Sequence, residues 1–144
     1  MTKKSTDDLL NIISQESDME QVLLDISDEL VQTTLSEELN RLLHEKKLKK
    51  SQVIQDSNLS ADYVYQIFSG RKKDPSRDKV LALGFGLGLS KDEMQYLLKV
   101  CGFSPLYPRL KREAIILFAL KEKQSIHTLN DWLYEKNLLP LTND

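Results

Sequence analysis

Helix-start signals recur along the chain and constrain its fold more than any other feature. A serine or threonine stands three residues before a glutamate at Ser17, Thr34 and Ser90, and each precedes apolar residues at helical spacing. Such a pair is typical of a helix N-terminus, because the hydroxyl and the carboxylate each bind a backbone N–H that lacks a partner inside the helix. No segment shows the alternation of a strand, and 5 Gly and 4 Pro are few for a turn-rich β fold. The sequence therefore predicts an all-α fold.

The middle of the chain predicts a short helix, a turn and a second helix. The first helix is expected over residues 50–57, and Asn58 tolerates the left-handed conformation of a turn after it. Ser60 is a suitable N-cap for the second helix, and Gly70 suits the left-handed position that ends it. Pro75 then predicts the first position of a further helix, where its missing N–H costs nothing. This segment has the pattern of a helix-turn-helix.

Charge is distributed unevenly behind the net charge of −2. Residues 1–36 carry two basic and eight acidic side chains, whereas residues 37–80 carry ten basic and seven acidic ones. Residues 81–144 carry eight basic and seven acidic ones. The bases of the middle part cluster at 46–50 and at 71–79, on either side of a less charged stretch. Such clusters indicate either a nucleic-acid surface or an ordinary solvated face.

The second helix of this pattern divides into a packing face and an outer face. The apolar residues expected to lock the two helices together and onto their neighbours are Val53, Ile54, Leu59, Val64, Ile67 and Phe68. The outer face then carries Ala61, Asp62, Tyr65, Gln66 and Ser69. Such a helix fits the major groove of B-form DNA, where the amide of Gln66 can donate to and accept from an adenine. The bases expected near phosphates are Lys49, Lys50, Arg71, Lys72, Lys73 and Arg77.

Residues 36–102 resemble the phage-repressor-like (Cro/C1, or XRE) helix-turn-helix domain. The resemblance rests on the segment LHEKKLKKSQVIQDSNLSADYVYQIFSGRKKDPSRDKVLALGFGLGLSKDE. Its matching features are a Leu-x-x-Leu-Leu-x-Glu-Lys first helix, Leu59-Ser60, Ser69-Gly70-Arg71, Asp74-Pro75-Ser76 and Leu89-Ser90. The resemblance implies a repressor-like helix-turn-helix core of five helices, to which this chain adds N- and C-terminal helices.

The resemblance also implies site residues and partners. In that family the first residues of the second helix of the motif contact bases, and these correspond to Ala61, Asp62 and Gln66 here. The residue that opens the preceding helix contacts the DNA backbone and corresponds to Lys50. Members of the family bind two half-sites as dimers, so the expected partners are double-stranded DNA and a second copy of the chain. The expected function is sequence-specific transcriptional regulation.

Several residues depart from the family pattern. Ile54 and Asn58 stand where the family usually has Ala and Gly. Asp62 brings a negative charge that can accept a hydrogen bond from a cytosine amino group but repels phosphate. Tyr63 and Tyr65 are bulky for this helix and are expected either to touch phosphates or to form a surface for protein contacts. The alternative to DNA binding is a protein-interaction or signalling module on a helix-turn-helix scaffold.

Helical extensions are expected on both sides of the DNA-binding domain at 36–102. Residues 1–35 form an acidic helical extension, and residues 103–144 form a helical hairpin packed on the domain. The apolar stripes of the first extension are Leu9, Ile12 and Ile13, followed by Val22, Leu23, Ile26 and Leu30. These stripes are expected either to pack on the helix-turn-helix or to form a dimer surface. Either extension is also a candidate surface for a protein partner.

The C-terminal half contains a weak internal repeat at an offset of 35 residues. The matched pairs include Arg77-Asp78 with Arg112-Glu113, Ser90 with Ser125, Gly102 with Asn137, and Pro105-Leu106 with Pro140-Leu141. Each unit has the pattern of a helix, a serine-capped second helix and a stop. The pattern fits either a duplicated hairpin or two generic amphipathic hairpins.

Other function classes find little support in the sequence. No run of 18 apolar residues exists, so no membrane span is expected, and the one cysteine, Cys101, fits a cytoplasmic protein without disulfides. His44 and His127 have no acids or thiols at ligand spacing, so neither a metal site nor a cofactor is expected. No catalytic residues are predicted, because no Ser/His/Asp or paired-carboxylate pattern is present. An enzyme is not expected.

Overall fold

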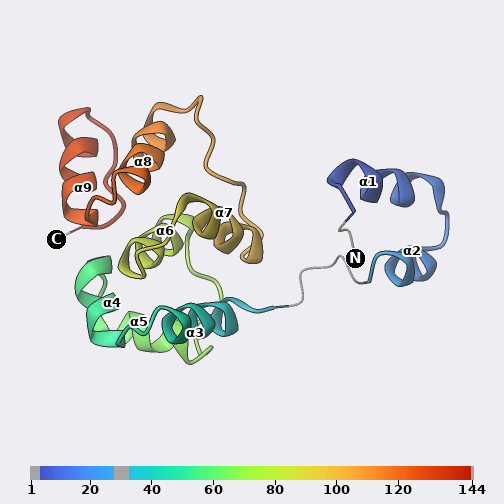
Figure 1. Cartoon of the computed structure of the whole chain (residues 1–144), viewed down its shortest axis with the longest axis horizontal. Coiled ribbons are helices and arrows are strands. Elements are labelled where there is room, and N and C mark those ends of the chain that lie inside the picture. The colour runs from blue at the N-terminus through green and yellow to red at the C-terminus, as the bar shows by residue number, and fades with distance from the viewer. Residues whose placement is uncertain (1–3, 28–32, 144) are drawn as a thin grey trace. The chain divides into compact units, whose positions relative to one another are not determined.

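The computed structural model describes residues 4–27 and 33–143, and it confirms the all-α prediction for them. These residues form nine helices and no strand (Figure 1). The helices are α1 (Thr6–Gln15), α2 (Met19–Asp25), α3 (Leu35–Glu45), α4 (Lys50–Ser57), α5 (Ala61–Phe68), α6 (Arg77–Gly86), α7 (Lys91–Val100), α8 (Lys111–Lys121) and α9 (Ile126–Glu135). Within the described ranges, none is long and apolar enough to cross a membrane.

The chain divides into two compact units, Met1–Gln32 and Thr33–Asp144. In the first unit, Ser5 caps α1, and its hydroxyl accepts a hydrogen bond from the Asp8 N–H at 3.1 Å. Neither α1 nor α2 contains a buried residue. Ile26, which follows α2, is buried, whereas the other described residues of the apolar stripes are half-buried or exposed. The choice between packing and dimerisation for these stripes stays a prediction.

The predicted start of α2 is wrong by one residue. Asp18, rather than Ser17, is the N-cap, and its carboxylate accepts a hydrogen bond from the Glu20 N–H at 3.1 Å. A carboxylate is a charged acceptor at the positive end of a helix, which favours Asp18 over the neighbouring hydroxyl. Leu30, which belongs to the predicted stripe of this segment, lies outside the described residues.

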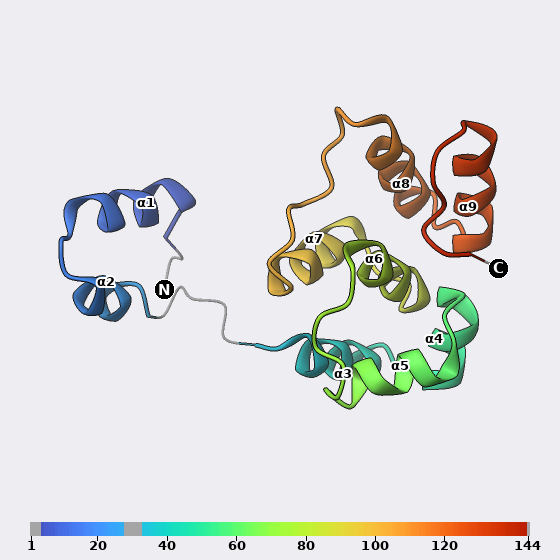
Figure 2. The ribbon, with the colours of Figure 1, turned by 180° about the vertical axis from the view of Figure 1, so that it is seen from behind.

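In the second unit, α6 and α7 lie between the group α3–α5 and the pair α8–α9. Figure 2 shows the same order from behind. One apolar cluster runs through all seven helices and includes fully buried Leu39, Val53, Leu81, Leu98 and Ile116. Gly86 is needed where α6 crosses α4, because a Cβ atom there would lie 2.8 Å from the Val53 carbonyl oxygen. This close crossing fixes α4 against the centre of the unit.

The predicted α4, turn and α5 occupy the expected residues. The Lys49 N–H donates to Oε1 of Gln52 at 2.9 Å, so the start of α4 is stabilised although lysine cannot cap it. Asn58 ends α4 in the left-handed conformation, with φ of 58°. Ser60 caps α5 by accepting from the Tyr63 N–H at 3.2 Å. The capping and turn residues of the sequence were therefore sufficient to predict these two helices and the turn between them.

The predicted start of α6 is wrong. The helix begins at Arg77, and Ser76 is its N-cap, with the hydroxyl accepting from the Lys79 N–H at 3.3 Å. Pro75 is therefore not at the first helical position but lies before the cap, where it is buried. A serine hydroxyl can satisfy a free N–H at the helix start, whereas a proline side chain cannot, and this favours Ser76 as the boundary.

The hairpins α6–α7 and α8–α9 share one geometry at an offset of 35 residues. Helices α7 and α9 span 91–100 and 126–135, and the caps Ser90 and Ser125 correspond. The turns also correspond, since positive φ occurs at Gly88 and Lys123 and again at Gly102 and Asn137. Matching bonds hold the ends: Leu106 N–H donates to Gln95 and Leu141 N–H donates to Asn130. This agreement favours a duplicated hairpin over two generic ones.

The two hairpins exchange reciprocal ion pairs at the starts of α6 and α8. Arg77 pairs with Glu113 through bonds of 2.5 and 3.1 Å, and Arg112 pairs with Asp78 through two bonds of 3.0 Å. Arg77 and Arg112 occupy equivalent positions of the repeat, and so do Asp78 and Glu113. The arginine of each hairpin therefore binds the carboxylate of the other hairpin in the same way. Such reciprocal contacts are characteristic of two units related by a two-fold axis. The hairpins thus pack as an internal pseudo-dimer.

Candidate functional site

The outer face of α5 is exposed and carries the three residues expected to contact bases. Ala61, Asp62 and Gln66 are all exposed, whereas Val64 and Ile67 on the opposite face are fully buried. The helix is short, because Gly70 with φ of 82° stops it two residues after its last helical residue, Phe68. A short helix packed along one face and open along the other is the local geometry on which a recognition surface depends.

Long-range hydrogen bonds hold both ends of α5. At its C-terminus, the hydroxyl of Ser36 and the amide of Asn40 each donate to the Phe68 carbonyl at 2.8 Å. Before its N-terminus, Asn58 in the turn donates from Nδ2 to the hydroxyl of Thr142 at 2.9 Å. The outer face of α5 is therefore presented by a rigid frame rather than by a free hairpin.

Tyr63 organises part of the basic cluster beside α5. The ammonium groups of Lys72 and Lys79 lie 5.6 and 5.0 Å from the centroid of its ring. Partial burial raises the pKa of the Tyr63 hydroxyl, so the ring stays neutral. Cations at this distance from an aromatic face are attracted to it. Tyr63 therefore lies beneath two lysines and is only half-exposed.

Tyr65 makes the same kind of cation–π contact, with the lysine that begins α4. Lys50 lies 5.8 Å from the centroid of the Tyr65 ring and 5.8 Å from that of Phe68. The Tyr65 side chain is 51% exposed, so part of its ring is open to solvent. The structure thus brings Lys50, Tyr65 and the outer face of α5 together.

The other predicted phosphate contacts fall into two groups. Lys49, Arg71 and Lys73 are exposed, as a phosphate contact requires. Arg77 is engaged inside the protein instead, because its guanidinium binds Glu113 and also the carbonyl oxygens of Ser104 and Pro105. The position of Arg77 within the basic cluster of the sequence did not indicate these internal contacts. Its equivalence to Arg112 in the repeat could have indicated them.

Two residues of this site were missed by the sequence reasoning. Lys79 contacts Tyr63, and its position in the first turn of α6, near the other bases, was an available signal. Thr142 holds the turn before α5, and no local pattern predicts a contact between residues 84 positions apart. Thr142 also accepts from Nδ2 of Asn130 at 3.0 Å.

A second feature of the unit is an apolar face on the C-terminal hairpin. We define this C-terminal apolar face by Ala114, Ile115, Phe118 and Trp132, which line a groove of about 400 Å³ together with Lys111, Glu135 and Lys136. The Phe118 and Trp132 rings contact each other with centroids 5.9 Å apart, and Phe118 is 49% exposed. The equivalent residues of the first hairpin, Val80, Leu83 and Leu97, are fully buried.

Chemically reactive arrangements do not stand out elsewhere. In the described ranges, no group of three or more His, Cys, Asp or Glu side chains is placed to hold a metal ion. Burial raises the pKa of the Cys101 thiol to about 11, so this cysteine is a thiol at neutral pH and not a reactive thiolate. No protein-family model, curated protein or solved structure matches the chain.

Proposed function

We propose that this chain is a sequence-specific regulator that binds double-stranded DNA with α5 in the major groove. In this proposal α3–α7 form a repressor-like core of five helices, and α4 and α5 are its helix-turn-helix. Ala61, Asp62 and Gln66 contact bases, with the Gln66 amide on an adenine edge. The order of the helices, the left-handed turn at Asn58 and the Ser60 cap support the proposal.

The observation that most supports the proposal is the arrangement of lysines at the sides of α5. Its exposed face is flanked by Lys50 on Tyr65 and by Lys72 and Lys79 on Tyr63. Lysines held at the sides of a helix are placed to contact phosphates while the helix reaches bases, and phosphate contacts fix the register of a protein on DNA. Lys49, Arg71 and Lys73 extend the same basic surface. We leave Arg77 out, because Glu113 and two carbonyls occupy it.

The regulator is proposed to act as a homodimer, and the C-terminal apolar face is its proposed contact with a second copy. Equivalent side chains of the first hairpin are buried by helices of the same chain, whereas this face is open. Exposed Phe and Trp side chains are enriched in protein interfaces. Lys111 and Lys136 lie at the rim with Glu135, so a two-fold copy can oppose charges of unlike sign.

The decisive experiment is a binding selection from a pool of random-sequence duplexes at low salt. The proposal expects enrichment of one motif, present as two half-sites spaced by about one helical turn when the dimer binds. The enriched duplex is then titrated at several salt concentrations, since phosphate contacts make affinity fall with salt. A selection that enriches no sequence contradicts the proposal.

Two matched pairs of variants separate base contacts from phosphate contacts. Gln66→Ala should lose about 1–3 kcal/mol of discrimination at one base pair, while Gln15→Ala, on α1, should not. Lys72→Ala should weaken binding to all sequences and make the log–log salt slope shallower by about one unit, unlike Lys99→Ala at the end of α7. Asp62→Asn should raise affinity for non-specific duplexes, because it removes the acid from the proposed interface.

A protein-interaction module is the alternative function, and the exposed ring of Tyr65 and the acid Asp62 favour it. A partner bound through this surface should be lost with Tyr65→Ala and should survive neutralisation of Lys72 and Lys73. DNA binding should instead be lost on neutralisation of Lys72 and Lys73 and should survive Tyr65→Ala. A pull-down with these variants, beside the duplex titration, decides between the two functions.

A further inference from the structure

The segments that follow the two duplicated hairpins are held in the same way. We call residues 103–107 the first strap and residues 138–142 the second strap. In each strap an arginine of the hairpin binds two carbonyl oxygens, and an amide side chain accepts from a leucine N–H. These bonds join Arg77 to Ser104 and Pro105, Arg112 to Leu139 and Pro140, Gln95 to Leu106, and Asn130 to Leu141. The straps are therefore equivalent parts of the duplication.

The straps differ in the second bond of the amide side chain. Nε2 of Gln95 donates to the Leu106 carbonyl at 3.1 Å, so both bonds of this amide go to the backbone of one residue. Asn130 is one methylene shorter, and its Nδ2 donates to the hydroxyl of Thr142 at 3.0 Å instead. Tyr107 stands at the position of Thr142 in the first strap and is 50% exposed, whereas Thr142 is 8% exposed. The second strap thus has a buried hydroxyl where the first has an exposed ring.

The buried hydroxyl is also bonded to the helix-turn-helix. Nδ2 of Asn58 donates to Thr142 at 2.9 Å. A backbone with φ of 58° is least costly for glycine, but glycine has no side chain that could reach the strap. Asparagine tolerates this conformation and supplies a donor. Residue 58 therefore combines the left-handed turn with a link to the second strap.

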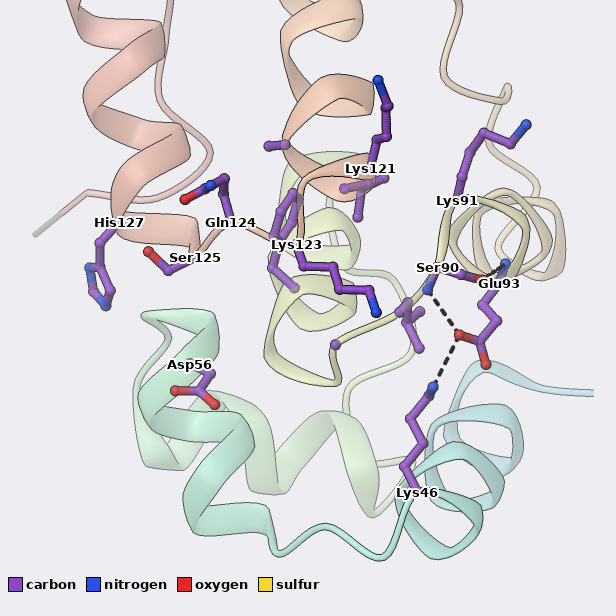
Figure 3. A pocket seen from close by; sticks show the side chains of 15 residues that line it. Lys46, Asp56, Ser90, Lys91, Glu93, Lys121, Lys123, Gln124, Ser125 and His127 are labelled. Carbon is purple, nitrogen blue, oxygen red and sulfur yellow. Dashed lines mark hydrogen bonds and ion pairs between the residues drawn. The ribbon is translucent and has the colours of Figure 1, made fainter.

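Near this link, α4 and the second hairpin are separated by open space. A cavity of about 740 Å³ is lined by Asp56 of α4 and by Ser125 and His127 at the start of α9. Figure 3 shows Asp56 across the cavity from the other two side chains. Because this space is open, packing across it does not hold the turn after α4 against the hairpin. The bond between Asn58 and Thr142 has this role instead.

The two ends of α5 are consequently held by different parts of the unit. Its C-terminal end is bound to α3 through two hydrogen bonds of 2.8 Å to the Phe68 carbonyl. Its N-terminal end follows Asn58 and is tied to the second strap. Rotation about the end that α3 holds displaces the first residues of α5 the most, and these include Ala61 and Asp62. The strap is thus placed to set the position of two residues proposed to contact bases.

We propose that the second strap controls the affinity of α5 for DNA, with Asn58 and Thr142 as positioning residues. The bond between them holds the first turn of α5 in the direction that binds DNA. Without the bond, this direction is one of several, and the affinity falls in proportion to the fraction of molecules that adopt it. By linkage, bound DNA stabilises the attached strap in return. The inference rests on the proposed function, because it names what regulates that same surface.

Asn58→Gly tests the proposal in the full chain, since glycine suits the turn and leaves no unpaired amide. Asn137→Gly is the matched control, because Asn137 has φ of 60° and is exposed. Asn58→Gly should bind the selected duplex about three- to tenfold more weakly, and the control should bind like the unaltered chain. The log–log salt slope should be the same in all three, because the bound state keeps its phosphate contacts. Unchanged affinity of Asn58→Gly, or a shallower slope, overturns the proposal.

Substitutions at Thr142 distinguish positioning from general stability. Thr142→Ser keeps the hydroxyl and should retain the affinity, whereas Thr142→Val should weaken binding as Asn58→Gly does. The double variant Asn58→Gly with Thr142→Val should bind no more weakly than Thr142→Val alone, because both changes remove one bond. Additive losses, or equal losses for Thr142→Ser and Thr142→Val, contradict a positioning role.

Hydrogen exchange in the absence of DNA separates this inference from the proposed function. The N–H groups of Tyr63 and Val64 both bond to Ser60, and they should exchange faster in Asn58→Gly than in Asn137→Gly. Equal exchange means that the strap does not hold α5, and the inference then fails whatever the chain binds. Faster exchange in a chain that enriches no duplex overturns the proposed function and the control of DNA affinity, but not the hold of the strap on α5.

Discussion

The hydroxyl of Thr142 accepts a hydrogen bond of 2.9 Å from the amide of Asn58, which lies 84 residues earlier in the chain. Asn58 is the left-handed residue between α4 and α5, and Thr142 follows α9. The same hydroxyl accepts a second bond from Asn130 in α9. The segment after α9 is therefore a structural part of the turn that sets the direction of α5.

Thr142→Val removes this hydroxyl with little change in shape. The amides of Asn58 and Asn130 each lose an acceptor at a site where Thr142 is 8% exposed. We expect a loss of about 1–3 kcal/mol in the free energy of unfolding, measured by urea denaturation. Thr128→Val is the control and should change stability by less than about 0.5 kcal/mol, because the Thr128 hydroxyl accepts its hydrogen bond from the exposed Ser125. Equal effects of the two variants would contradict this role.

Glu113 should make the pairing of the two hairpins sensitive to acid. Burial acts to raise the pKa of this carboxyl, but Arg77 and the Tyr107 N–H outweigh it and bring the pKa below its ordinary value of 4.5. The ionised form is thus favoured by folding. Its stabilising contribution is complete above the unfolded pKa of about 4.5 and is lost as pH falls through the lower folded pKa.

Thermal unfolding of Glu113→Gln across pH 3–7 measures this contribution. The variant should be less stable than the unaltered chain at pH 7. The difference should shrink as pH falls below 4.5, because the unfolded chain binds a proton there before the folded chain does, and it should be lost below the lower folded pKa. A difference that stays constant over this range would show that Glu113 stabilises the fold only through its shape.

Gly86→Ala should destabilise the protein although alanine favours helices. A Cβ atom at this position would lie 2.8 Å from both the Ser57 Cβ and the Val53 carbonyl oxygen, so α4 must move. We expect a cost of about 1–3 kcal/mol in urea denaturation. Gly84→Ala should cost less, because its Cβ would clash with the flexible end of Met94 and would meet Leu89 Cδ1 at an ordinary contact distance of 3.5 Å. The opposite order of the two variants would contradict a close crossing of α4 and α6.

Phe118→Glu should abolish the proposed dimer. A carboxylate in the C-terminal apolar face would lose its hydration when a second copy covers it, at a cost of several kcal/mol. Light scattering should give a mass of twice 16.6 kDa for the unaltered chain and 16.6 kDa for the variant. Tyr134→Glu is the control, since Tyr134 is 76% exposed and lies outside the groove. A monomeric unaltered chain at high concentration would refute this contact.

Much of the fold could be predicted because its helices carry local signals. Ser60 and Ser90 cap the expected helices, and Asn58 adopts the expected turn. The errors at Ser17 and Pro75 arose where two neighbouring residues could each begin a helix. In both places the neighbouring residue is the better acceptor for a free backbone N–H, a carboxylate at Asp18 and a hydroxyl at Ser76.

The candidate site was harder to predict than the helices. Exposure of Gln66 and Asp62 followed from helical spacing, since their opposite face is apolar. The pairing of Arg77 with Glu113 could not be predicted in this way, because a charged residue in a basic cluster gives no indication of a distant carboxylate.

The contact between Phe118 and Trp132 has a practical consequence for studying this protein. Trp132 is the single tryptophan of the chain, so ultraviolet-excited emission at long wavelength comes from one half-exposed indole on the C-terminal apolar face. Any molecule that covers this face would remove water from the indole and shift the emission toward blue. The protein therefore contains its own optical reporter at this surface.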